Sequence, residues 1–463
     1  MSNKVEKKLL YLIFLLIFTF NIYNFSIFPY SQENHLKIEK KSEVENIKIG
    51  SSANGFISSD DNELFWFIQI SDTQFLWHNV SKVAEFYKFL NETYTEINPL
   101  FIYHTGDIND ANFGLEQDKE GWENYEKALD DNNMNASIYM DVIGNHDAAN
   151  DPMFTYFLNY SIMGQTFNTT QYSFNKSFTF GNYAFIGLNT AKKSYNLFEF
   201  GFEGFLSSEE LDWYEIELEK YKESDKIFVF GHHPPSYPPF YTIKSEESLS
   251  GRDFYELNEE YNVSFYLSGH NHENTFQYFN NLLTITTSNF DQGGGIYRII
   301  SIDHNRLSTS LEYVGNWPQA IITNPPGEEY LLGDLNDIDE KLRVLAWDPM
   351  GIVSVKWSLF DTQTESQVIN WEPLERISNE NPLWKGNLNF TNRGNLLLKV
   401  KIEGGSGEII KELRYSLIDN DNNNNTTIII LVFVILITGV VSIVIIYNRY
   451  IPNKPKEREK IES

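Results

Sequence analysis

The sequence of 463 residues contains no cysteine. Disulfide bonds, zinc–thiolate sites and a cysteine nucleophile are therefore excluded. Positive charge is also scarce, because 36 lysine and arginine residues stand against 64 aspartate and glutamate residues and leave a formal net charge of -28. Such a surface repels nucleic-acid phosphates, so we expect no nucleic-acid partner.

Apolar residues, in contrast, are abundant. Hydrophobic residues make up 41% of the chain and aromatic residues 15%, which is enough for a sizeable core, and the length favours two folded units. From residue 63 to 300, short apolar runs alternate with segments of helical spacing. We expect strands at 64–70, 99–105, 137–143, 183–189, 226–231 and 263–268, and helices at 80–94, 121–131 and 207–222.

This alternation predicts an α/β layered fold. Ser207 and Glu210 form the pattern of a capping box at the start of the last expected helix. The hairpin-like pair at 177–180 and 182–190 predicts that the sheet is mixed, with an antiparallel part.

A break with three prolines, Pro318, Pro325 and Pro326, ends this pattern. From about residue 327 to 417 the chain has alternating runs such as KLRVLAWD and IVSVKWSLFD, separated by turn signals and without long helices. The pattern predicts a small all-β, Ig-like sandwich.

The N-terminal region carries a basic flank and a short apolar run. Lys4, Lys7 and Lys8 precede residues 9–20, LLYLIFLLIFTF, which is typical of a signal peptide. An uncleaved signal anchor is the alternative, because apolar character resumes patchily as far as Phe28.

Residues 428–447 form an uncharged apolar run. A run of this length can cross the roughly 30 Å hydrocarbon core of a bilayer, so we expect a transmembrane helix. The tail that follows is basic, and by the positive-inside rule it lies in the cytoplasm while residues 35–425 lie outside. We therefore expect a single-pass membrane protein, or a two-pass one if the N-terminal segment is retained.

Acceptor patterns for N-glycosylation agree with the expectation of an outward-facing glycoprotein. The pattern N-x-S/T begins at Asn79, Asn91, Asn135, Asn159, Asn168, Asn175, Asn262 and Asn389.

Five loops carry the residues that point to chemistry. Each follows an expected strand: SDTQ (71–74), GDIND (106–110), GNHD (144–147), GHHPP (231–235) and SGHNH (268–272). Ligands gather at the carboxyl ends of strands in α/β sheets. Five of the nine histidines of the chain fall in these loops. Together the loops predict a metal site.

The residue types suit two divalent cations that share one anion. Asp107 is the natural bridging carboxylate, and imidazoles suit Zn, Fe and Mn. A hydroxide held between two such cations forms near neutral pH and attacks phosphorus in line. A nearby histidine can then donate a proton to the leaving oxygen.

As an ordered series these loops resemble the motifs of the calcineurin-like metallophosphoesterases. The resemblance implies a first metal held by Asp72, Asp107 and His272. It implies a second metal held by Asp107, Asn145, His232 and His270. It further implies that His146 is the acid or a transition-state donor and that Asp110 orients it. His233 and Pro234 are expected to shape their loop, and His104 is expected to be structural.

The resemblance covers roughly residues 63–300. Together with the hydropathy and charge patterns, it divides the chain into a signal peptide or anchor at 1–30, a polar segment at 31–62, the metallophosphoesterase domain at 63–317, the β-sandwich at 318–418, an Asn-rich spacer at 419–427, the transmembrane helix at 428–447 and a basic tail at 448–463. The segments FGNYAFIGLNT, YNLFEFG and GNWPQAIITNPP resemble most closely the transmembrane protein 62 group.

Gln74 departs from the family pattern, which usually has histidine at this position. We interpret Gln74 as a weakened metal ligand through its carbonyl oxygen, which would favour Mn²⁺ or Mg²⁺ over Zn²⁺ in the first site. The alternative is that its amide holds a metal-bound water.

Three functions follow from these observations. The first is a membrane-anchored, outward-facing phosphoesterase that acts on a phosphomono- or diester, including a phospholipid-type substrate. The second is a membrane protein with this fold that has lost turnover and has a binding or structural role. The third is an adhesion-type protein whose working part is the β-sandwich. Trp77 and residues 236–241, SYPPFY, are candidates for lining a substrate mouth or for packing.

Overall fold

The computed structural model describes residues 55–59, 62–75, 80–111, 116–193, 203–235, 242–290, 294–327, 341–378, 381–388 and 394–417. The expected signal segment, spacer, membrane run and basic tail lie outside the described residues, as do Trp77, His78 and residues 236–241. Among the helices that are described, none combines the length and the apolar character needed to cross a membrane.

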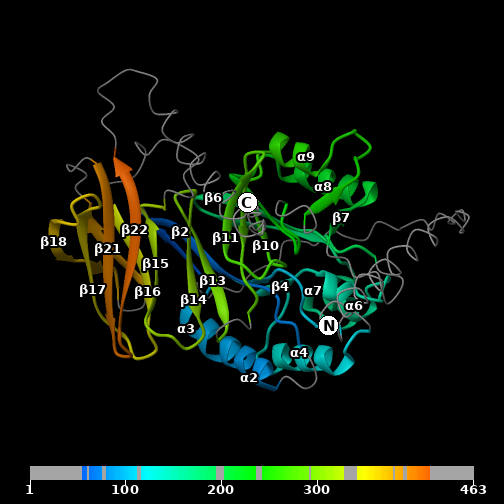
Figure 1. The fold of residues 1–463 in the computed structure, drawn as a ribbon, viewed down its shortest axis with the longest axis horizontal. Coiled ribbons are helices and arrows are strands. Elements are labelled where there is room, and N and C mark those ends of the chain that lie inside the picture. Colours follow the sequence, from blue (N-terminus) through cyan, green and yellow to red (C-terminus); the bar gives the residue numbers. More distant parts are fainter. Residues whose placement is uncertain are drawn as a thin grey trace, which may run out of the picture. The chain divides into compact units, whose positions relative to one another are not determined.

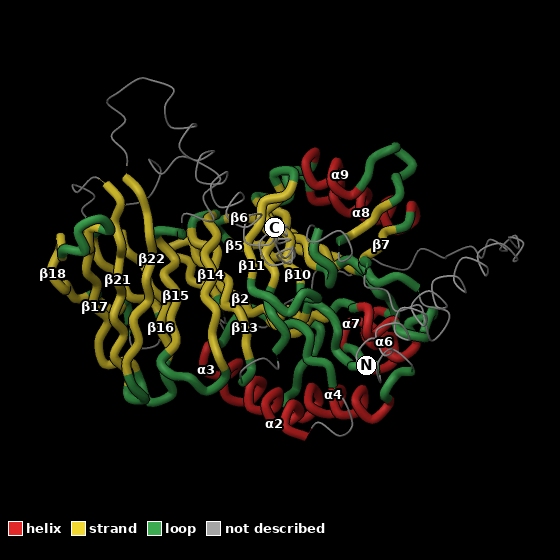
Figure 2. Tube along the Cα trace, viewed as in Figure 1, coloured by secondary structure: helices red, strands yellow, loops and turns green. Residues whose placement is uncertain are grey.

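Two six-stranded mixed sheets form the first part of the described chain (Figures 1 and 2). The first sheet has the order β14-β13-β2-β3-β4, and β1 pairs with β2. Its strands are β1 (Phe56–Ser59), β2 (Asn62–Ile70), β3 (Ile102–His104), β4 (Tyr139–Asp141), β13 (Ile296–Asp303) and β14 (Arg306–Tyr313). Strands β2, β3 and β4 run parallel to one another.

The second sheet has the order β11-β12-β10-β8-β6-β5. Its strands are β5 (Tyr172–Phe178), β6 (Gly181–Gly187), β8 (Lys226–Phe230), β10 (Phe265–Ser268), β11 (Thr275–Phe279) and β12 (Leu282–Thr286). Strands β6, β8, β10 and β12 are parallel, whereas β5 and β6 form the expected antiparallel hairpin. The prediction of a mixed α/β fold is confirmed.

An aromatic layer joins the two sheets face to face. Phe65 and Phe67 of β2 belong to the same buried cluster as Phe185 of β6 and Phe230 of β8. The rings of Phe67 and Phe230 lie 6.2 Å apart between their centroids. Burial on both faces explains why β2 reads NELFWFIQI, a nearly continuous apolar run.

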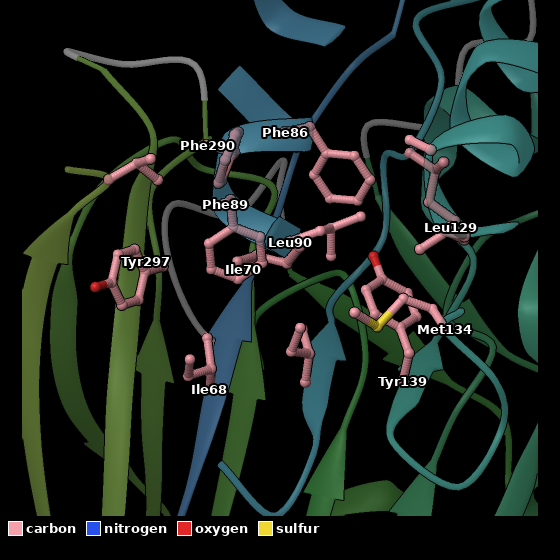
Figure 3. Packing of buried hydrophobic residues seen from close by; sticks show 14 of the residues in the cluster. Ile68, Ile70, Phe86, Phe89, Leu90, Leu129, Met134, Tyr139, Phe290 and Tyr297 are labelled. Atoms are coloured by element: carbon pink, nitrogen blue, oxygen red, sulfur yellow. The ribbon is translucent and has the colours of Figure 1, made fainter. Parts of the chain in front are cut away.

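Helices cover the outer face of each sheet. Figure 3 shows Ile68 and Ile70 of β2 lying near Phe86 and Phe89 of the helical segment on the first sheet, all in one cluster. The helices of the first part are α2 (Val80–Lys88), α3 (Tyr94–Ile97), α4 (Lys119–Asp131), α5 (Asn145–Ala148), α6 (Thr155–Tyr160), α7 (Ile162–Phe167), α8 (Ser208–Tyr221) and α9 (Phe254–Glu260). A π-helical turn, Phe89–Thr93, joins α2 to α3.

Helix α8 begins as the sequence predicts. The Ser207 side chain accepts from the Glu210 backbone amide, and the Glu210 carboxylate accepts from the Ser207 backbone amide. This helix packs on the second sheet through Leu211, Tyr214 and Leu218, together with α9. The short strands β7 (Gly204–Leu206) and β9 (Ile243–Ser245) pair beside it.

The rest of the described chain consists of all-β antiparallel sheets. One has the order β15-β16-β20-β19 and the other β18-β17-β21-β22. The strands are β15 (Gln319–Asn324), β16 (Lys341–Trp347), β17 (Ile352–Asp361), β18 (Gln367–Pro373), β19 (Glu375–Arg376), β20 (Leu383–Asn387), β21 (Gly394–Gly404) and β22 (Glu408–Leu417). Both sheets contribute to one buried cluster, so they form two packed layers. The Ig-like character of this part stays a prediction.

A buried ion pair joins the β part to the first sheet. Arg343 of β16 donates from Nε to Asp303 Oδ2 at 2.8 Å, and both side chains are buried. The Asp303 carboxylate also accepts from Thr323 Oγ1 at 2.6 Å and contacts His304 Nδ1 at 2.5 Å. Burial opposes the charge of Asp303, but His304 and Arg343 outweigh burial and lower its pKa. The two parts therefore share polar as well as apolar contacts, which the sequence did not indicate.

Replacing Arg343 with Met should leave the Asp303 carboxylate buried without its cation, which costs about 3–5 kcal/mol of the free energy of unfolding. Urea unfolding at pH 7 measures this loss. Lys119→Met, which removes an exposed cation paired with Glu123, is the control and should change stability much less.

The pH dependence of this loss has a definite sign. The pKa of Asp303 is lowered in the folded protein, so its stabilisation is present above the unfolded pKa and is lost as the pH falls through the folded pKa. The gap between wild type and Arg343→Met should therefore persist above the ordinary aspartate pKa of 3.8 and narrow as the pH falls below it. A gap that stays constant below that pH would show that the charge of Asp303 does not contribute to the loss.

Candidate metal centre

The five loops meet at the carboxyl ends of β2, β3, β4, β8 and β10. Backbone hydrogen bonds link neighbouring loops: the amide of Asp72 donates to the Gly106 carbonyl, and the amide of Gln74 donates to the Asp107 carbonyl. Within the second sheet, the amide of Gly269 donates to the His232 carbonyl, and His232 Nδ1 lies 2.9 Å from the carbonyl oxygen of Thr105, which follows β3 of the first sheet. The structure thus brings all nine sequence-predicted residues into one cluster of loops.

Asp107 lies at the centre of this cluster and is buried. Its Oδ1 accepts from the backbone amide of His146 at 2.8 Å, and its Oδ2 lies 3.1 Å from His232 Nε2 and 3.7 Å from His146 Nε2. Burial opposes ionisation, but the rings of His232 and His146 outweigh it and hold the pKa of Asp107 well below its usual range. Asp107 is therefore a carboxylate at neutral pH.

Asp72 forms a second buried carboxylate at the end of β2. Its Oδ2 accepts from the Ser71 hydroxyl and from the backbone amide of His270 at 3.1 Å. Its Oδ1 has no hydrogen bond within the described residues, although it lies 3.2 Å from His272 Nε2. Despite burial, the contact with Asp72 raises the pKa of His272, while His272 and His232 lower that of Asp72.

His232 connects the two carboxylates to the remaining residues. Its Nδ1 lies 2.9 Å from the Thr105 carbonyl oxygen, which can only accept, so Nδ1 carries the hydrogen. Its Nε2 then faces Asn145 Oδ1 at 3.0 Å and His270 Nδ1 at 3.2 Å. The nearby Asp107 overcomes the effect of burial and raises the pKa of His232 to about 9.

The donor set fits divalent cations. Ligand atoms of Asp72, Asp107 and His232 lie within 4.8 Å of one another, and so do those of His232, His233 and His270. Asp72 Oδ1 is buried and lacks a hydrogen bond in the described part, as a ligand oxygen facing imidazole nitrogens would. Mixed carboxylate, amide and imidazole ligands suit Mn, Fe or Zn.

Three groups form contacts with His146, and a fourth group lies near its ring. In addition to its backbone bond to Asp107, its carbonyl oxygen accepts from Gln117 Nε2 at 2.8 Å and its Nδ1 lies 3.1 Å from Asp110 Oδ1. The amide of Gln74 lies 3.5 Å from His146 Nε2. Burial disfavours the charged ring, but Asp107 and Asp110 outweigh it and raise the pKa of His146. The side chain is 20% exposed, so a ligand can reach it.

Five of the loop residues share an unusual backbone conformation. Asp72, Gln74, Asp107, His270 and His272 all have φ between 46° and 71°, in the left-handed region. Residues other than glycine occupy this region at a cost of order 1–3 kcal/mol each and are concentrated at functional sites. Surrounding contacts therefore hold these five residues in place.

Two glycines permit the close approach of loops. A Cβ at Gly144 would lie 2.2 Å from Asp107 Oδ1, and a Cβ at Gly269 would lie 2.3 Å from Asp72 Oδ2. Any side chain at either position would displace a candidate ligand carboxylate.

Residues outside the predicted set support the loops. Asp147 is buried and accepts from the backbone amides of Ile108, Asn109 and Gly144, which joins two loops. Burial and the charge of Asp107 raise the pKa of Asp147 to about 7. Asp147 is the last residue of the GNHD motif, so the sequence pattern could have identified it as a residue that supports the loops.

Gln117 and His104 form hydrogen bonds with the backbone of the loops. Gln117 donates to the carbonyl oxygens of His146 and Ala149 and accepts from Trp122 Nε1 at 2.9 Å. No motif pointed to Gln117. His104 accepts from the Gly106 amide at Nδ1, and its burial lowers its pKa to about 3.

His233 is fully buried, as is His232. Its Nδ1 is 3.0 Å from Thr190 Oγ1, and its ring centroid is 4.5 Å from that of His270.

Residues 65–274 match the family model described as calcineurin-like phosphoesterase. This part of the chain belongs to that family. The calcineurin-like segment includes all five loops and the strands of both sheets from Phe65 in β2 to β10.

Two curated relatives and one solved structure are similar to this chain. Transmembrane protein 62 of Mus musculus is 26% identical over 324 residues, which cover 64% of this chain and 47% of that protein. A protein of Arabidopsis thaliana named for a metallophosphoesterase is 27% identical over 232 residues, 45% of this chain and 30% of that protein. The chain thus spans less than half the length of these relatives. The solved structure of GAP50, described as the anchor in the inner membrane complex of Plasmodium, is 14% identical with a TM-score of 0.35 and covers 55% of this chain and 85% of that one.

Gln117→Met should keep the shape of this side chain but leave two carbonyl oxygens without their donor and Trp122 Nε1 without its acceptor. We expect the free energy of unfolding to fall by about 1–3 kcal/mol. Urea unfolding measures the change, with Gln165→Met as control because Gln165 bonds Glu126 at an exposed site. Equal stability of the two variants would show that Gln117 does not support the His146 loop.

Proposed function

We propose that the protein is a metal-dependent phosphoester hydrolase that acts on a phosphomono- or diester, with a phospholipid-type ester among the candidates. The observation that carries the proposal is the position of Asp107, a buried carboxylate that lies between two sets of candidate ligands. Family membership of residues 65–274 supports the same reaction class.

The first set of ligands in this proposal is Asp72, Asp107 and His272. The second set is Asp107, Asn145, His232 and His270. When bound, two divalent cations at these sets would neutralise phosphoryl charge and supply an activated water. Asp107 contributes to both sets, so its loss should affect both.

The chain's own residues orient these ligands. The Thr105 carbonyl fixes the tautomer of His232, which leaves Nε2 directed at the candidate second site. The Ser71 hydroxyl and the His270 amide fix the orientation of the Asp72 carboxylate. The loops are therefore arranged before any substrate arrives, which reduces the reorganisation that catalysis requires.

His146 is the proposed proton donor to the leaving oxygen. Asp110 contacts Nδ1 and so orients the ring, while Nε2 lies on the side of Asp107. The raised pKa of His146 favours the protonated ring near neutral pH, as a proton donor requires.

We also propose that the enzyme is membrane-anchored and faces outward. The proposal rests on the apolar run at 428–447 and on the basic tail that follows it. Among the described residues, the sequon residues Asn91, Asn135, Asn159, Asn168 and Asn262 are exposed, as glycosylation requires.

The division of roles is tested by two variants. Asp107→Asn should remove both bound metals and abolish hydrolysis, because the shared charge is lost. His146→Ala should keep the metals and lower kcat by about 10²–10⁴, the range for a proton donor. Elemental analysis and hydrolysis of a phosphodiester with an alkyl alcohol leaving group, which needs a proton, measure the two effects, with Asp131→Asn, on the exposed end of α4, as control. Loss of metal from His146→Ala would contradict the division.

The topology predicts that a tag at the C-terminus is protected from protease added outside sealed cells. The reason is the lysine and arginine bias of the tail. Permeabilised cells serve as control, because the tag should then be cut. Cleavage of the tag in sealed cells would overturn the proposed orientation.

A further inference from the structure

The geometry points to Gln74 as a positioning residue for His146 rather than a ligand of the first metal. This inference rests on the proposed function and deepens it, because it concerns the proton donor of the same site. It also revises the interpretation of Gln74 that the sequence favoured.

The side chain of Gln74 is directed at the ring of His146. The amide nitrogen lies 3.5 Å from His146 Nε2, and within the described residues this is the hydrogen-bond contact of the Gln74 side chain. Gln74 is 9% exposed, so its amide is largely shielded from water and has a strong preference for a protein partner. The ring nitrogen it meets is the one proposed to carry the transferred proton.

The backbone fixes this direction. Gln74 has φ of 46°, and its amide donates to the Asp107 carbonyl at 3.0 Å. Its own carbonyl oxygen accepts from Lys82 Nζ at 3.4 Å. With both backbone polar groups engaged, the side chain leaves the loop on the side of His146.

The carboxylate of the first metal set has other neighbours. Asp72 Oδ1 lies beside His272, and Asp72 Oδ2 accepts from Ser71 and from the backbone amide of His270. In the described part of the chain, the hydrogen bonds and ion pairs of the Asp72 carboxylate do not include one with Gln74. A neutral amide oxygen is also a weaker ligand for Fe or Zn than the imidazole usual at this position.

The amide is chemically suited to hold a ring nitrogen. It offers both a donor and an acceptor on one planar group, so it can hydrogen-bond Nε2 whether or not that nitrogen carries a hydrogen. Asp110 holds the opposite nitrogen, Nδ1, at 3.1 Å. The ring of His146 is therefore held at both nitrogens, and Nε2 lies 3.7 Å from Asp107 Oδ2.

The test uses the full-length chain in detergent and the variant Gln74→Met, which keeps the length of the side chain and removes its hydrogen bonds. Two esters are compared, one with a 4-nitrophenol leaving group, which leaves without help, and one with an alkyl alcohol leaving group, which needs a proton. We expect kcat for the alkyl ester to fall about tenfold and kcat for the nitrophenyl ester to change less than about threefold. In the His146→Ala background, Gln74→Met should have no further effect on the alkyl ester, because the two residues act as a unit.

A metal titration distinguishes the ligand role. Mn²⁺ added to chelator-treated protein and followed by electron paramagnetic resonance should give the same number of sites and similar affinities for wild type and Gln74→Met. A loss of one site, or a fall of tenfold or more in its affinity, would overturn the inference and restore Gln74 as a ligand. An equal fall in kcat for both esters would also overturn it.

Ring ¹⁵N resonances of histidine give a readout that needs no activity. In the metal-free protein, the His146 Nε2 resonance, assigned by its absence from His146→Ala, should shift in Gln74→Met and stay in place in the control Gln165→Met. An unchanged resonance in Gln74→Met would refute the contact. If wild type hydrolyses neither ester, the proposed function fails, and this resonance still decides whether Gln74 holds His146.

Discussion

The buried carboxylate of Asp107 is the constraint on which the arrangement of the loops depends. Its Oδ1 fixes the backbone of the GNHD loop through the amide of His146, and its Oδ2 faces His232 from the second sheet. Its own carbonyl holds Gln74 in the first loop. An anion in a buried position is stable only with partners, and these partners come from loops far apart in the sequence. The two sheets and their aromatic layer serve to bring those loops together.

The site combines features that oppose stability. Two buried carboxylates lie near imidazole rings, and five residues occupy the left-handed region of backbone conformation. The fold offsets these costs outside the site: Asp147 satisfies three backbone amides, and Gln117 satisfies two carbonyl oxygens with Trp122 behind it. Such support explains how a cluster of charge and strain can persist before a cation neutralises it.

Much of the fold and of the candidate site could be predicted from the sequence, for physical reasons. The expected strands overlap β2, β3, β4, β6, β8 and β10, because buried strands read as apolar runs, and all of these except β6 are followed by one of the five loops with Gly, Asp, Asn or His. The capping box of α8 was visible because it is local. Gln117 and the Asp303–Arg343 pair were not visible, because their partners are distant in the sequence and no spacing marks them. The direction of the Gln74 side chain also required the structure, since it depends on where the His146 loop lies.

The central claim is that Asp107 joins two metal sites in one centre. Crystals of the protein grown with Mn²⁺ test it most directly through the anomalous scattering of manganese. The account expects two peaks about 3.5–4 Å apart. One should lie among Asp72, Asp107 and His272, and the other among Asp107, Asn145, His232 and His270. A single peak, or peaks away from the Asp107 carboxylate, would contradict the account.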